Sequence, residues 1–333
     1  MVLTTDSVYE RIARSLNMQG GLSHYYRLTF QAMGTRCSID YKASPPSAAT
    51  TYKENVCRWL AEFEARYSRY ISKSLISKIN QNAGKAWVEI DKETEKLFQL
   101  CDWYYWLTQG LFDPSALPLI HLWDYKMKHI TLPEPQAVER IRASVNWENV
   151  QREEGKIFLP KKGMAIDLRG IGKEYAVDRA IEIAFDHGIK DILIDFGADM
   201  RMHGNAPQQG AWVIGLEHPK DPGRCWGGVA LKNRAIASSG DYLRHIKISG
   251  KHYGHIINPH TGYPVANGSL SVSVIAPTCT EAGILSTTAF ILGQQKGWEF
   301  IEHYHQAEGC IWTNEYIIQT GGFNHYELTK MAQ

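Results

Sequence analysis

The segment from His255 to Pro264 carries a side chain suited to proton transfer. His255 stands three residues before an Asn258-Pro259 pair, and Gly262 follows shortly after. Proline fixes its own φ and biases the preceding residue toward extended backbone, while glycine readily takes positive φ, so we expect a sharp reversal beside the histidine. An imidazole held there could act as a general base. The alternative is a polar loop whose histidine only hydrogen-bonds the backbone, and this segment alone leaves both open.

A glycine turn at residues 169–173, Arg-Gly-Ile-Gly-Lys, could bind phosphate. It follows the apolar stretch Met164–Leu168 and precedes a helical pattern, so we expect a strand, a turn and a helix in succession. Backbone N–H groups at a helix N-terminus suit a phosphate, since Gly170 and Gly172 permit close approach and Lys173 adds charge. Such turns are common, so a purely structural turn is the alternative.

The elements that position these turns alternate between strand and helix patterns. Apolar and polar residues alternate from Tyr26 to Tyr41 around a bend at Met33-Gly34-Thr35, which predicts two strands. Apolar residues at helical spacing predict packing helices at 51–66, 92–108 and 279–292. Short apolar runs predict strands at 191–195, 212–215, 228–231, 235–239, 270–275 and 309–312.

The N-terminal segment has the pattern of an amphipathic helix. Val8, Ile12 and Leu16 share one face, and we expect the Gly20-Gly21 pair to end the helix. Charged residues, among them Glu10, interrupt the segment where a secretory signal needs an apolar run. No later apolar run is long enough to span a membrane. We therefore expect a cytoplasmic protein without a membrane anchor.

Composition is typical of a globular protein. The chain has 333 residues, of which 44% are hydrophobic and 21% charged, and its formal net charge is +1. Because the charge is near zero and no dense Lys/Arg run occurs, we expect no nucleic-acid partner. The six cysteines form no CxxC pair, which indicates free thiols in a reducing compartment.

Several short motifs occur in one order along the chain. They are Met33-Gly34-Thr35, Gly110-Leu-Phe-Asp-Pro-Ser115, Asp167-Leu-Arg-Gly-Ile-Gly-Lys173 with Asp178, Phe196-Gly-Ala-Asp199, Ser238-Ser-Gly-Asp-Tyr242, His255-Ile-Ile-Asn-Pro-His-Thr-Gly262 and Thr287-Thr-Ala-Phe-Ile-Leu-Gly293. Together they resemble the ApbE family of FAD:protein FMN transferases, and their concurrence is far more specific than any one motif. The resemblance covers residues 26–320. It implies an ApbE-like domain at 26–325, as one unit or two interleaved lobes, after an N-terminal helical extension at 1–25.

The resemblance implies an α/β fold of the T-fold-like type, with mixed or antiparallel sheets and packing helices. It also implies an enzyme that uses FAD and Mg²⁺ to attach FMN, through a phosphoester, to a Thr or Ser of an acceptor flavoprotein, or that hydrolyses FAD to FMN and AMP. His255 would be the catalytic base, and the Gly170 carbonyl and Thr287 would bind the metal. The cofactor-binding residues would be Met33, Tyr70, Leu111, Phe112, Asp113, Asp167, Arg169, Lys173, Gly197 and Ile257. The sequence does not identify the acceptor.

Four positions depart from the family pattern. Gly283 stands where the family has a metal-binding Asp, four residues before Thr287. Glu281 could replace that carboxylate only if the helix start shifted, because residues two apart on a helix point about 200° apart. Arg169, Glu174 and Asn258 replace Gly, Gly and Asp, respectively. Arg169 could pair with phosphate oxygens, or Arg169 and Glu174 could form a surface ion pair.

Three functions therefore stay open. The first is flavin transfer to a cytoplasmic acceptor. The second is a divergent family member that binds FAD or a related nucleotide with altered or lost catalysis. The third is a structural subunit that keeps the fold while its pocket has decayed.

Overall fold

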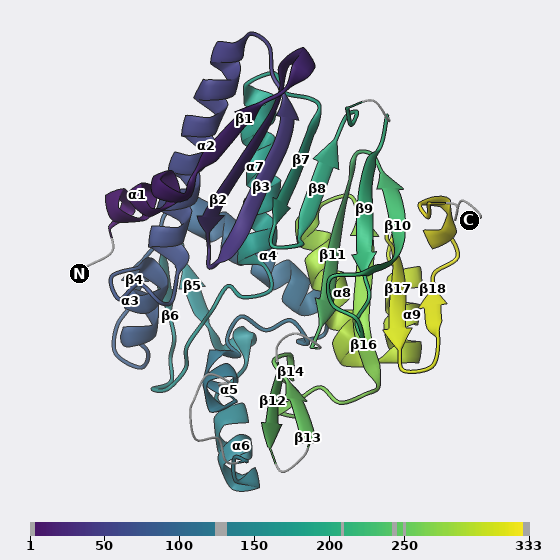
Figure 1. Ribbon diagram of the computed structural model, residues 1–333. Coiled ribbons are helices and arrows are strands. Elements are labelled where there is room, and N and C mark those ends of the chain that lie inside the picture. The colour runs from purple at the N-terminus through teal and green to yellow at the C-terminus, as the bar shows by residue number, and fades with distance from the viewer. Residues whose placement is uncertain (1–3, 124–131, 208–209, 242–244, 249–250, 329–333) are drawn as a thin grey trace.

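A large antiparallel sheet forms the centre of the molecule (Figure 1). The computed structural model describes residues 4–123, 132–207, 210–241, 245–248 and 251–328. Within these residues nine strands form the sheet in the order β1-β2-β3-β7-β8-β11-β16-β17-β18. Their bounds are β1 Asn17–Gly20, β2 Tyr25–Ala32, β3 Thr35–Lys42, β7 Ile192–Phe196, β8 Met200–His203, β11 Arg234–Gly240, β16 Ser269–Ala276, β17 Glu308–Thr313 and β18 Ile317–Gln319.

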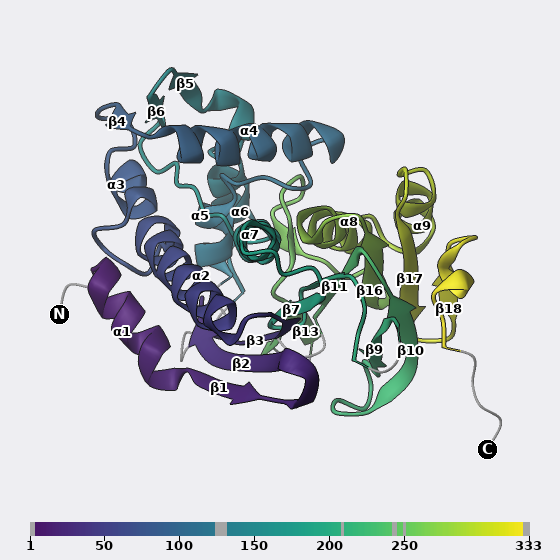
Figure 2. The same cartoon turned by 90° about the horizontal axis from the view of Figure 1, so that it is seen from above.

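Four helices lie over one face of this sheet (Figure 2). They are α2 (Pro46–Tyr67), α7 (Gly172–Asp186), α8 (Cys279–Leu292) and α9 (Gln294–Glu302), and each packs against the next. Helix α8 is buried on almost every side, because α7, α9, β11 and β16 surround it. A capping box between Thr278 and Glu281 begins α8, and Gly293, at a φ of +83°, ends it.

A hairpin of β9 (Trp212–Glu217) and β10 (Cys225–Leu231) packs on the opposite face of the sheet, over β8, β11, β16 and β17. Alternate residues of β9 are buried, which matches the two-residue period of a strand with one solvent-facing side. Together with Met202 and Ile236 of the sheet they form a second apolar cluster, separate from the main core.

Smaller elements surround the helical layer. They are α1 Thr5–Ser15, α3 Leu75–Gln81, α4 Lys92–Leu107, α5 Leu117–Leu122, α6 Pro135–Arg142, β4 Val88–Glu89, β5 Gln151–Glu153, β6 Lys156–Phe158, β12 His245–Ile248, β13 Lys251–Gly254, β14 Ile257–Asn258 and β15 Tyr263–Pro264. Helix α4 lies beyond α7 as seen from the sheet, and α5, α6 and the β12–β13 hairpin lie at one end of the molecule (Figures 1 and 2).

The α/β fold with antiparallel sheets is confirmed, as is the helix at 279–292. The predicted strand at Met164–Leu168 is wrong, because within the described residues the segment makes a single bridge, between Ala165 and Ala116. The chain beside it enters α5 at Leu117 and so offers no longer partner strand.

The predicted end of the N-terminal helix at Gly20-Gly21 is also wrong. Helix α1 ends at Ser15, because residues 17–20 pair with β2 as the edge strand β1. Val8 and Ile12 are fully buried in the main core. The division at residue 25 and the two lobes stay predictions, and residues 1–3, Tyr242 and 329–333 lie outside the described residues. None of the described helices has the length and apolarity needed to cross a membrane.

Candidate functional site

The glycine turn before α7 places Lys173 beside a second glycine turn. Gly170 has a φ of +87°, and α7 begins two residues later. The Lys173 Nζ lies 2.5 Å from Oδ2 of Asp199 and donates a hydrogen bond of 3.1 Å to the carbonyl of Gly197. Burial alone would lower the pKa of Lys173, but the Asp199 and Glu174 carboxylates outweigh it and raise this pKa. Lys173 is therefore held as a cation at the N-terminus of α7.

Position 197 needs a glycine because β3 lies close to it. It has a φ of +66°, and a Cβ added there would lie 2.3 Å from Oγ1 of Thr35. Since a side chain cannot fit, the turn between β7 and β8 comes close to the start of β3. The structure thus brings Lys173, Gly197 and the Met33-Gly34-Thr35 bend together.

Glu174 fills the space beside Gly283. It is only 8% exposed, and its Cγ lies 2.6 Å from the position that a Cβ would take at Gly283. Its Oε2 is buried and has no hydrogen-bond partner among the described residues. Burial and the nearby Asp199 carboxylate raise the pKa of Glu174 well above its usual range. The surface ion pair between Arg169 and Glu174 is therefore wrong, because Glu174 points into the interface of α7 and α8.

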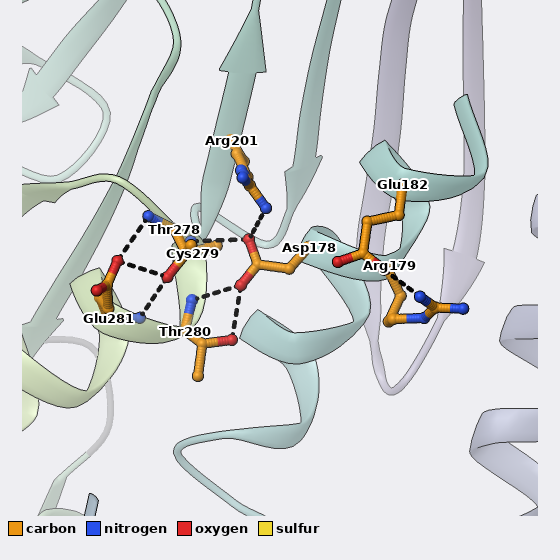
Figure 3. A network of polar contacts seen from close by, with 8 residues as sticks. All are labelled: Asp178, Arg179, Glu182, Arg201, Thr278, Cys279, Thr280 and Glu281. Atoms are coloured by element: carbon orange, nitrogen blue, oxygen red, sulfur yellow. Dashed lines mark hydrogen bonds and ion pairs between the residues drawn. The ribbon is translucent and has the colours of Figure 1, made fainter. Parts of the chain in front are cut away.

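A network around Asp178 fixes this interface (Figure 3). Asp178 of α7 accepts hydrogen bonds of 2.9 Å from the backbone N–H groups of Cys279 and Thr280, and one of 2.7 Å from the Thr280 hydroxyl. Arg201 of β8 forms an ion pair with it at 2.9 Å. The first N–H groups of α8 are thereby satisfied by α7, and Gly283 follows one turn later, opposite Glu174.

The carboxylate of Glu281 is part of the capping box at the start of α8. Its Oε2 accepts hydrogen bonds from the backbone N–H and the hydroxyl of Thr278, at 3.0 and 2.8 Å, and its Oε1 accepts one from Tyr304 at 3.1 Å. Figure 3 shows that it points away from the α7 side of the helix. The idea that Glu281 replaces a carboxylate at position 283 is therefore wrong.

Thr287 lies one turn beyond Gly283 on the same face of α8. Its hydroxyl lies 2.8 Å from that of Ser239 in β11. The described residues contain no group of three or more His, Cys, Asp or Glu placed to share a metal ion. Mg²⁺ prefers hard oxygen ligands, and the Thr287 hydroxyl with the unsatisfied Oε2 of Glu174 fits that preference. The donor set is thus compatible with Mg²⁺.

Tyr70, Asp167 and Arg169 gather around Arg69. The Tyr70 hydroxyl accepts hydrogen bonds from Arg69 at 2.7 Å and from Arg169 at 3.3 Å. The Arg69 Nε lies 3.2 Å from Oδ2 of Asp167. Tyr70 itself is 69% exposed, and the Arg69 guanidinium lies over its ring, 4.6 Å from the ring centre. Sequence reasoning missed Arg69, which directly precedes Tyr70 and has no motif of its own.

The Leu111–Asp113 segment lies beside the same glycine turn. Phe112 is buried, and its ring is the nearest group to a Cβ added at Gly170. Asp113 accepts hydrogen bonds from the backbone and the hydroxyl of Ser115 at 2.7 and 2.6 Å. Burial raises its pKa despite these bonds. Asp113 therefore shapes the turn, while Leu111 lines a hollow between α4, α8 and α9.

The predicted reversal after His255 is present as the β14–β15 hairpin. Ile257 pairs with Pro264, and the Gly262 N–H donates to the Asn258 carbonyl at 2.8 Å. A residue from another part of the chain holds the hairpin in place: Trp123 Nε1 donates a hydrogen bond of 2.8 Å to the Gly262 carbonyl. His255 itself is half-buried between β13 and β14.

Met33 lies at the bend between β2 and β3 with a φ of +50°. Its backbone N–H donates to Oε2 of Glu64 at 2.7 Å, which ties the bend to α2. Sequence reasoning also left Asp199 without a role, although its place directly after the Phe196-Gly197 turn was a usable signal. The roles of all these residues toward FAD or a metal stay predictions.

Comparisons with known proteins show what this chain is similar to. The sequence model of the ApbE family matches residues 33–311. The FAD:protein FMN transferase of Haemophilus influenzae is 28% identical over 286 residues, which cover 83% of each chain. That of Treponema pallidum is 26% identical over 289 residues, covering 82% of this chain and 80% of the other.

Solved structures share the fold. The crystal structure of the ApbE protein from Thermotoga maritima has a TM-score of 0.82 and 30% identity, covering 92% of this chain and all of the other. The flavin transferase ApbE from Vibrio cholerae has a TM-score of 0.81 at 24% identity, covering 93% and 99%. The chain belongs to the ApbE family.

Proposed function

We propose that this chain is an FAD:protein FMN transferase. It would cleave the pyrophosphate of FAD and join FMN, through a phosphoester, to a Thr or Ser hydroxyl of an acceptor flavoprotein. The relatives named above carry this activity in their names. The observation that carries the proposal is the cationic Lys173 at the N-terminal turn of α7, held there by Asp199 and by the Gly197 carbonyl.

The chemistry follows from charge and proton transfer. The acceptor oxygen attacks the phosphorus on the FMN side, the bridging P–O bond breaks, and AMP leaves with its electron pair. Lys173 and the N-terminal end of the α7 dipole stabilise the negative charge that develops on the phosphate oxygens. His255 accepts the proton of the acceptor hydroxyl. With water in place of the acceptor, the same residues would release free FMN and AMP.

A bound Mg²⁺ would add Lewis-acid stabilisation of the pyrophosphate. The Thr287 hydroxyl and the Gly170 carbonyl are its proposed protein ligands. Met33, Tyr70, Leu111, Phe112, Asp113, Asp167, Arg169, Gly197 and Ile257 are the proposed contacts of FAD. Arg169 donates a hydrogen bond to the Tyr70 hydroxyl, and a guanidinium is also suited to pair with a phosphate.

We place the reaction in the cytoplasm. All six cysteines are free thiols, and Cys37, Cys57, Cys101, Cys279 and Cys310 are buried. A reducing compartment keeps such thiols unpaired. Detection of the native protein by cell fractionation tests this assignment.

The test of the function measures AMP released from FAD, together with flavin fluorescence on a candidate acceptor in a denaturing gel. The variant His255→Ala should lower both by about 10²–10⁴-fold, because the hydroxyl loses its base, while equilibrium binding of FAD stays unchanged. The matched control is His305→Ala, an exposed histidine of the loop between α9 and β17. A wild-type protein that binds FAD and releases no AMP with any acceptor would contradict the proposal and favour the divergent binder.

A further inference from the structure

One carboxylate oxygen buried in the α7–α8 interface has no hydrogen-bond partner among the described residues. Glu174 is 8% exposed, and its Oε2 has no hydrogen-bond partner within the part of the chain that the structure describes. Placing a carboxylate in such surroundings is costly unless a donor or a cation compensates it. A ligand that supplies positive charge would remove this cost.

The charges around Glu174 do not balance. Lys173 is bound to Asp199, so one ammonium group faces two buried carboxylates, those of Asp199 and Glu174. Arg201 does not help, because it is paired with Asp178. The cluster therefore carries one excess negative charge when both carboxylates are ionised.

The side chain of Glu174 occupies the place of the missing side chain at position 283. A Cβ at Gly283 would lie 2.6 Å from Cγ of Glu174, and 3.2 Å from both its Cδ and its Oε1. Thr287 presents its hydroxyl on the same face of α8, one turn on. A carboxylate from α7 and a hydroxyl of α8 thus lie on the same face of α8, about one helical turn apart.

We propose that Glu174 is a metal ligand, reaching from α7 into the space at Gly283 to bind Mg²⁺ together with Thr287. The hard oxygen donors, and the negative charge that the cluster gains when Glu174 ionises, match a divalent cation of this class. The inference rests on the proposed function, in which Mg²⁺ assists cleavage of FAD, but its test needs no FAD. The competing arrangement is a proton shared between Glu174 and Asp199 with no metal at Glu174.

The first test measures metal binding directly. Mg²⁺ binding is followed by calorimetry and Mn²⁺ binding by electron paramagnetic resonance, on the full chain without FAD. Glu174→Gln keeps the shape of the side chain and removes its charge, so we expect both dissociation constants to rise at least about tenfold, equivalent to 1.4 kcal/mol. The matched control is Glu182→Gln, because Glu182 lies on the exposed side of the same helix, where it pairs with Arg179 (Figure 3). It should bind metal like the wild type.

A second test moves the carboxylate to the other helix. Gly283→Asp alone would collide with Glu174, while Glu174→Gly removes both the collision and the carboxylate. The double variant Glu174→Gly/Gly283→Asp should bind Mg²⁺ better than Glu174→Gly, with circular dichroism and thermal unfolding to show that each variant is folded. Equal metal affinity in the wild type and Glu174→Gln, or a folded double variant no better than Glu174→Gly, would overturn the inference.

Failure of the two proposals can be told apart. Metal binding that depends on Glu174, in a protein that never releases AMP from FAD, contradicts the transferase function and supports the metal site. AMP release that requires Mg²⁺ and is equal in the wild type and Glu174→Gln contradicts the role of Glu174 and supports the function.

Discussion

Asp178 and Glu174 lie one turn apart on α7, and both are buried against α8, yet their surroundings differ. Asp178 accepts three hydrogen bonds from the start of α8 and pairs with Arg201. Glu174 faces a glycine and leaves Oε2 without a hydrogen bond among the described residues. Burial raises the pKa of both side chains, so burial alone does not separate them. The two side chains differ in whether each buried carboxylate oxygen has a hydrogen-bond partner.

This difference separates a structural carboxylate from one that is open to a ligand. The interactions of Asp178 hold α8 in place whether or not a ligand is bound. Glu174 leaves Oε2 without a hydrogen bond among the described residues, so its contribution to stability should depend on which ligand binds there. The two side chains therefore predict opposite responses to neutralising substitutions.

The largest effect is expected for Asp178→Ala. The substitution leaves the Arg201 guanidinium and the N–H groups of Cys279 and Thr280 without their acceptor, so the free energy of unfolding should fall by about 3–5 kcal/mol. Urea denaturation followed by circular dichroism measures this loss. Glu182→Gln again serves as the control on α7. A loss below about 1 kcal/mol would mean that the network does not fix α8.

Glu174→Gln should act in the opposite direction in metal-free protein. Burial and the Asp199 carboxylate raise the pKa of Glu174, so this carboxyl costs stability wherever the unfolded chain would ionise it. Glu174→Gln removes that cost, and the free energy of unfolding in EDTA should stay equal or rise by about 1 kcal/mol. Adding Mg²⁺ at about 100 times its dissociation constant should stabilise the wild type by about 2.7 kcal/mol and the variant much less. Denaturation curves with and without Mg²⁺ measure both quantities. If the variant were strongly destabilised in EDTA, Glu174 would be structural like Asp178.

The elements that position these residues could largely be predicted from the sequence. Helix α8 covers the same residues that its apolar spacing indicates, and β2 and β3 meet at the Met33-Gly34 bend as expected. Both signals are local, because a cap or a turn fixes where each element begins. The strand at Met164–Leu168 failed because a strand also needs a partner, and its neighbour becomes helical.

The contact between Glu174 and Gly283 could not be predicted in the same way. Each residue alone indicates a departure from the family pattern, but their proximity depends on which faces of α7 and α8 meet. That geometry is set by the Asp178 network, and two of its partners are backbone N–H groups, which every sequence possesses. Lys173 was easier to find, because the glycines around it mark a turn directly.

The smallest effect is expected for Glu281, the third carboxylate near the start of α8. Its contacts are the capping box with Thr278 and a hydrogen bond from Tyr304. Glu281→Ala should therefore lower the free energy of unfolding by about 1 kcal/mol, as expected for a lost cap, and Mg²⁺ affinity should not change. Denaturation and calorimetry on the same preparation measure both. A stability loss with weaker metal binding would mean that the cap also positions Gly283 and Thr287. Glu281 would then affect both stability and metal binding, and of the three carboxylates Asp178 alone would be purely structural.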